Sequence, residues 1–145
     1  MNEGEKPSVD KNVMIDLLDE IMACQFTEQQ RRILDLIIRL SIGCGKETAC
    51  IPIQKDFQIV GVRQSHVKHH LDWLIRMKVI TKDYRFYKIN QDCDKWRVSK
   101  SMFFNPERLE DLIELNEKDH EELVEDLEHQ LDLLGYPRNL RKYLD

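Results

Sequence analysis

The sequence lacks the segments that would place it in or across a membrane. Its 145 residues contain no run of about 18 apolar residues, the length that a membrane-spanning helix requires. The first twelve residues, MNEGEKPSVDKN, are polar and contain no apolar segment of a secretion signal. We therefore expect a cytoplasmic chain that does not contact the membrane.

The signatures of metal sites and of common enzymes are also missing. The four cysteines lie at positions 24, 44, 50 and 93 and form no C-x-x-C pair, which favours free thiols over a zinc ribbon or a redox dithiol. No phosphate-binding glycine loop, G-x-S-x-G or H-E-x-x-H sequence occurs. His66, His69 and His70 share part of a helix, but the pattern places no further zinc ligand near them. We expect no enzyme, no cofactor and no metal.

What the sequence does have is an uneven distribution of charge. The net charge is −5, but residues 51–104 contain eleven Lys and Arg against five Asp and Glu, a net of +6. Residues 107–132 contain twelve acidic residues against Arg108 and Lys118, a net of −10. A basic middle followed by an acidic segment indicates two functional surfaces. The alternative is that the acidic run is only the solvated face of a helix.

Two helices are predicted before residue 45. The first begins at a cap formed by Asp10 or Asn12 and ends near Ala23. Its apolar stripe consists of Val13, Leu17, Leu18 and Ile21. Thr27 and Gln30 have the spacing of a capping box and begin the second helix. That helix has a wide apolar face (Ile33, Leu34, Ile37, Ile38 and Leu40), so we expect it to be the central core helix, ending at the glycines of residues 43–45.

The pattern of residues 51–97 is typical of a winged helix-turn-helix. Residues 50–53 contain a proline and predict a short edge strand. Residues 54–60 predict a short helix with Phe57 and Val60 facing inward, and Gly61 permits a turn with positive φ. A longer helix follows over residues 63–77, with strands over residues 79–82 and 85–89 joined by a tight turn at residues 83–84. The predicted fold is mainly α with a small β wing. The apolar positions of the longer helix are Val67, Leu71, Leu74 and Ile75.

This fold would present basic and polar side chains to double-stranded DNA. A recognition helix enters the major groove with its N-terminal turns, where Arg, Lys and Gln side chains can bind base edges. His70 is expected on the core side, packed rather than functional. The basic side chains of the wing would contact phosphates or the minor groove. The alternative is a basic surface that is merely solvated. The candidate DNA-binding residues are Arg63, Gln64, Ser65, His66, Lys68 and His69 in the recognition helix, and Lys82, Tyr84, Arg85 and Lys88 in the wing.

The acidic segment predicts a helical tail. Asn105 and Pro106 form a good helix start, and the glycine at position 135 ends the helical pattern. The polar stretch 116–122 divides the tail into two helices. We expect a disordered N-terminus over residues 1–9, a DNA-binding domain over residues 10–104 and an acidic helical tail over residues 105–145. Three possibilities stay open for the tail: packing on the winged helix, dimerisation, and docking of another protein. Its apolar positions are Leu109, Leu112, Ile113, Val124, Leu127, Leu131 and Leu134.

Three segments resemble the N-terminal domain of the lambda-type phage replication protein O family. They are FTEQQ at residues 26–30, VGVRQSHV at residues 60–67 and YKINQD at residues 87–92, followed by Lys95 and Trp96. The resemblance covers residues 10–97. It implies a replication initiator that binds repeated origin sites as a dimer in the bacterial cytoplasm. It also implies recruitment of a replicative helicase or its loader through the C-terminal region.

The sequence departs from that family at three points. Arg63 stands where a serine cap is usual, His70 replaces a small residue, and the C-terminal part is shorter. Two other functions stay open. One is a transcription regulator with the same DNA-binding domain. The other is a small phage protein that inhibits a host complex through protein contacts or through acidic mimicry of DNA.

Overall fold

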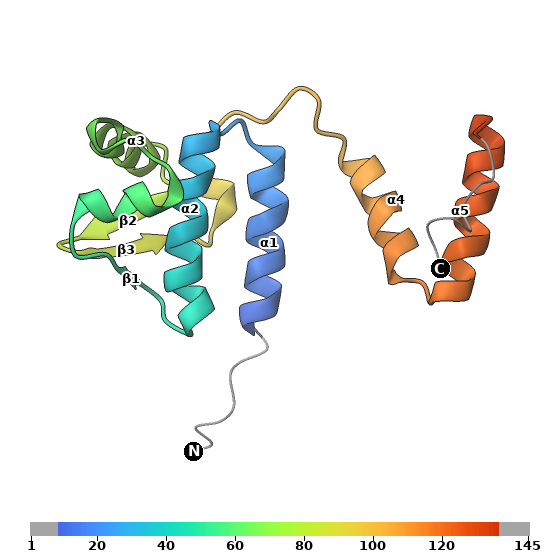
Figure 1. The fold of residues 1–145 in the computed structure, drawn as a ribbon, viewed down its shortest axis with the longest axis horizontal. Coiled ribbons are helices and arrows are strands. Elements are labelled where there is room, and N and C mark those ends of the chain that lie inside the picture. The colour runs from blue at the N-terminus through green and yellow to red at the C-terminus, as the bar shows by residue number, and fades with distance from the viewer. Residues whose placement is uncertain (1–8, 137–145) are drawn as a thin grey trace, which may run out of the picture. The chain divides into compact units, whose positions relative to one another are not determined.

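The computed structural model describes residues 9–136 and divides the chain into two compact units, residues 1–104 and residues 105–145. Residues 1–8, for which we predict disorder, lie outside the described residues. Residue 9, the last of that predicted segment, already begins a helix. Unit 1 contains the sheet together with helices α1, α2 and α3, and unit 2 contains helices α4 and α5 (Figure 1).

The first helix differs from its prediction at both its start and its stripe. Helix α1 spans Val9–Ala23, so Asp10 and Asn12 lie inside it and not at the predicted N-cap position. Leu17 and Ile21 are buried, but Leu18 is 53% exposed. The reason is geometric, because each residue turns the helix by about 100°, which rotates Leu18 away from the face that Leu17 buries.

Helix α2 is the central helix that its apolar face predicts. It spans Glu28–Leu40 and runs along the sheet and beside α1 (Figure 1). The Thr27 hydroxyl accepts from the Gln30 N–H at 3.1 Å, and the Gln30 side-chain oxygen accepts from the Thr27 N–H at 3.0 Å. This confirms the capping box and satisfies two amides that the first turn leaves unpaired. After a short 3-10 turn over Ile42–Cys44, the chain enters the sheet.

The helix-turn-helix follows the short strand β1. Residues Gln54–Val60 form the 3-10 helix η2 rather than an α-helix, and Phe57 is fully buried. Gly61 has a φ of 85°, which confirms the turn predicted there. Helix α3 then spans Gln64–Arg76.

The described residues form an antiparallel sheet with strand order β1-β3-β2. β1 spans Ala49–Cys50, β2 spans Ile80–Asp83 and β3 spans Phe86–Ile89. The predicted edge strand is shorter than expected, because Pro52 has no N–H to continue the ladder after Ile51 donates to the Arg85 carbonyl at 2.9 Å. Asp83 pairs with Phe86, so the hairpin turn consists of Tyr84 and Arg85, not of residues 83–84.

One apolar core holds unit 1 together. Ile33, Leu34 and Ile37 of α2 are completely buried. Phe57 of η2 meets Tyr87 of β3 edge to face, with ring centroids 5.5 Å apart. This geometry is favourable for an aromatic pair beyond the area it buries. The core therefore joins α2, the short helix of the turn and the middle strand of the sheet.

His70 links α3 to α2 at the edge of this core. Its Nε2 lies 2.8 Å from the side-chain oxygen of Gln29, while its buried Nδ1 has no hydrogen-bond partner among the described residues. Burial lowers the pKa of His70 below 6.5, and the neighbouring His69 and His66 lower it further. The folded chain therefore favours the neutral imidazole, because a proton on Nδ1 would create a buried N–H without an acceptor.

Unit 2 consists of two helices joined by a short polar link. α4 spans Pro106–Glu117. Its N-cap is Asn105, whose side chain accepts from the Arg108 N–H. α5 spans His120–Leu134, with Asp119 as its N-cap and Gly135 as its C-cap. This confirms two helices divided in the polar stretch, and with unit 1 it confirms a mainly α fold with a small β wing. No helix among residues 9–136 is long and apolar enough to cross a membrane.

Two apolar residues of η2 provide a matched test of the core. Phe57 is fully buried and Ile59 is 76% exposed. We expect Phe57→Ala to lower the free energy of unfolding by about 3–5 kcal/mol, because it leaves a cavity beside Tyr87. Ile59→Ala should change it by less than about 0.5 kcal/mol. Urea denaturation followed by circular dichroism measures both, and similar losses for the two variants would contradict this core.

The His70 contact predicts a loss of stability in acid. Because the folded-state pKa of His70 is lowered, its contribution is complete above 6.5 and is lost as the pH falls through the folded-state value. His70→Gln should therefore lose less stability than the parent chain between about pH 7 and pH 5. His129→Gln, which replaces an exposed histidine of α5, should follow the parent chain. Urea denaturation at several pH values checks this, and identical pH profiles for His70→Gln and the parent chain would refute it.

Candidate nucleic-acid interface

Helix α3 buries one face and leaves the opposite face in solvent. Val67, Leu71 and Leu74 are buried against the core. Arg63 is the N-cap of α3, and its side chain makes no capping hydrogen bond. A serine at that position would satisfy an amide of the first turn, whereas here an exposed guanidinium side chain belongs to the residue at the positive end of the helix. The six predicted side chains of this segment are all exposed: Arg63, Gln64, Ser65, His66, Lys68 and His69.

The six residues do not share one stripe of the helix. Ser65 and His69 lie opposite the buried face, whereas Gln64 and Lys68 lie along one flank and His66 along the other. The outward stripe continues with Asp72 and Arg76, both exposed. Sequence reasoning missed these two residues, although their spacing of three and seven from His69 indicates the same face.

An ion pair neutralises part of this surface. Lys68 Nζ lies 2.8 Å from the Asp72 carboxylate, and both side chains are more than half exposed. An exposed pair of this kind contributes little to stability. Lys68 can therefore exchange Asp72 for a phosphate or a guanine edge at small cost. Asp72, in turn, could accept a hydrogen bond from a cytosine amino group.

The register of the wing separates its two lysines. Lys82 is paired with the buried Tyr87, and its ammonium lies 5.7 Å from the centroid of that ring. Lys88 is paired with Thr81, and both are exposed. Because side chains alternate between the faces of a strand, Lys82 lies on the core-facing side of the hairpin and Lys88 on the other. The structure therefore does not place these two predicted site residues side by side.

The turn of the wing brings the other two predicted residues together. Tyr84 has a φ of 59° and is 74% exposed at the tip. The Arg85 guanidinium carbon lies 5.1 Å from the centroid of the Tyr84 ring, and Arg85 Nη1 donates to the Pro52 carbonyl at 2.5 Å. Arg85 thus ties the tip of the wing to the segment after β1, and sequence spacing gave no sign of this contact.

Among residues 9–136, no group of three or more His, Cys, Asp or Glu side chains is placed to hold a metal ion. The histidines of α3 instead form ring contacts. His66 and His69 lie 6.3 Å and 5.6 Å from His70, measured between ring centroids.

Comparison with known protein families places this surface in context. Residues 12–96 match the family described as bacteriophage replication protein O. The match spans more than half of the chain and includes α2, the helix-turn-helix and both strands of the wing. No match was found among curated proteins or among solved structures. The chain belongs to the bacteriophage replication protein O family.

Proposed function

We propose that unit 1 binds double-stranded DNA at a specific sequence and acts as a phage replication initiator at repeated origin sites. The observation that carries this proposal is the exposed N-terminal part of α3 with its N-cap Arg63, together with a basic wing, in a chain of a phage replication family. Exposed basic and amide side chains at the start of such a helix suit readout of the major groove.

Each side of the surface has its own part in this proposal. Arg63 and Gln64 can bind base edges, because guanidinium and amide groups match the hydrogen-bonding atoms of guanine and adenine. Ser65, His69 and Arg76 line the outward stripe and can reach bases or phosphates. The wing supplies affinity that does not depend on sequence, through charges that neutralise phosphates.

The charge distribution supports unit 1 as the part of the chain that binds DNA. Residues 51–104 have a net charge of +6, whereas residues 107–132 in unit 2 have a net charge of −10. Phosphates repel carboxylates, so unit 2 is the poorer surface for DNA. Recruitment of a replicative helicase or its loader through unit 2 stays a prediction, as does a homodimer.

The family favours replication over the two alternatives. A transcription regulator with this domain would use the same DNA chemistry, since fold alone does not decide function. Membership of a replication family makes the initiator the better proposal. An inhibitor that mimics DNA would use the acidic helices of unit 2 and would not need the exposed basic start of α3.

Selection from random duplex DNA tests the proposal directly. We expect the full chain to enrich one short sequence motif, with affinity that falls as salt rises because cations are released from phosphates. A fragment of origin repeats should then bind several copies of the chain. Failure to bind any duplex above the non-specific level at low salt would remove both the initiator and the regulator.

Single substitutions separate base contacts from phosphate contacts. Arg63→Ala and Lys68→Ala should each weaken binding to the preferred site by about 1–3 kcal/mol and relax the choice of sequence. Lys88→Ala should weaken all sequences alike and lower the salt slope by about one. Lys11→Ala, an exposed lysine of α1, is the charge-matched control and should change neither quantity. Fluorescence anisotropy with preferred and scrambled duplexes measures these effects, and uniform losses in all three variants would exclude direct readout.

A further inference from the structure

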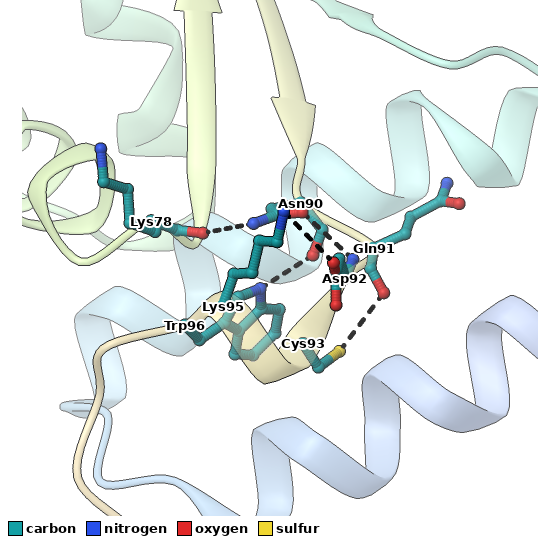
Figure 2. A network of polar contacts seen from close by, with 7 residues as sticks. All are labelled: Lys78, Asn90, Gln91, Asp92, Cys93, Lys95 and Trp96. Carbon is teal, nitrogen blue, oxygen red and sulfur yellow. Dashed lines mark hydrogen bonds and ion pairs between the residues drawn. The ribbon is translucent and has the colours of Figure 1, made fainter.

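One residue at the base of the wing uses all its hydrogen-bonding groups to join three segments. The Asn90 N–H donates to the Val79 carbonyl at 2.7 Å, and its side-chain Nδ2 donates to the Lys78 carbonyl at 2.9 Å. Its side-chain Oδ1 accepts from the Asp92 N–H at 3.1 Å, and its carbonyl accepts from Trp96 Nε1 at 2.8 Å. Figure 2 shows Asn90 between Lys78 on one side and the turn that leads to Trp96 on the other.

The Lys78 side of this junction is where the recognition helix becomes the wing. α3 ends at Arg76, and β2 begins at Ile80. Lys78 between them has a φ of 65°, a left-handed conformation that is uncommon for a residue with a side chain. The hydrogen bond from Asn90 Nδ2 to the Lys78 carbonyl stabilises Lys78 in this conformation. Asn90 thereby ties the end of β3 to the link between α3 and β2.

The Trp96 side anchors the junction to the core. Trp96 is buried, and its ring meets Phe26 edge to face with centroids 6.0 Å apart. Phe26 in turn meets Trp73 of α3, with centroids 6.2 Å apart. A second hydrogen bond holds the same link, since the Arg97 N–H donates to the Met77 carbonyl at 2.8 Å. The segment that follows β3, residues 90–97, is therefore tied to both ends of the link between α3 and β2.

We propose that Asn90 is a positioning residue for DNA binding, which sets the angle between the wing and α3 so that both contact one duplex. The inference rests on the proposed function, and it assigns Asn90 no contact with DNA. An amide suits this position because it donates to one main-chain group and accepts from another. An aspartate would keep the acceptor but place an oxygen against the Lys78 carbonyl.

The geometry can be tested without DNA. Residual dipolar couplings of backbone amides report the orientation and order of α3 and of the hairpin Ile80–Ile89 in one alignment frame. We expect a single frame for the parent chain, and reduced couplings confined to the hairpin in Asn90→Ala and Asn90→Asp. Gln91→Ala, an exposed neighbour, is the matched control and should behave like the parent chain. Trp96→Phe removes one bond of Asn90 but keeps an aromatic ring, so it tests the same junction if Asn90→Ala does not fold.

The functional consequence is a loss of the contribution of the wing. Asn90→Ala should lower the salt slope of binding by at least about one, the loss expected for Lys88→Ala, and the double variant should lose no more than Asn90→Ala alone. A residue that only stabilises the fold would leave the slope unchanged for the folded fraction. A single alignment frame or an unchanged slope in a folded Asn90→Ala variant would overturn the inference. If the parent chain binds no duplex, the proposed function fails, while the couplings still decide whether Asn90 positions the wing.

Discussion

Burial of the apolar face of α2 is the interaction on which the rest of unit 1 depends. Ile33, Leu34 and Ile37 are inaccessible to solvent, and the sheet and α3 both pack against this helix. The capping box at Thr27 fixes where α2 begins, and the turn at Ile42–Cys44 fixes where it ends. Every element of the candidate interface takes its place from this helix, because each must bury its own apolar face against the same core.

The candidate interface is a consequence of that burial. α3 buries Val67, Leu71 and Leu74, so Ser65 and His69 must face solvent. The same constraint places Tyr87 inside the wing and Lys88 outside it. Polar contacts then refine the surface. Arg85 ties the tip of the wing to Pro52, and Asn90 ties its base to Lys78, so the hairpin is held at both ends.

Unit 2 has a different balance of forces. No residue of α4 or α5 is buried, so these helices are not stabilised by an apolar core of their own. Their side-chain caps, Asn105 and Asp119, satisfy amides at the helix starts. Lys118 forms an ion pair with Asp126, and this hydrogen bond raises the pKa of Lys118. Local interactions therefore contribute a larger share of the stability in unit 2 than in unit 1, consistent with the short apolar stripes of the unit 2 sequence.

The sequence by itself determined the features that depend on neighbours along the chain. Thr27 with Gln30, the positive φ of Gly61 and the buried stripe of α3 all follow from caps, turn residues and the 3.6-residue period. Tertiary structure decided what depends on pairing between distant segments. The strand register placed the hairpin turn at Tyr84 and Arg85 and separated Lys82 from Lys88, because a shift of one residue reverses the face of every side chain. The bonds of Asn90 to Lys78, twelve residues away, and of Arg85 to Pro52 likewise arise only when those segments pack together.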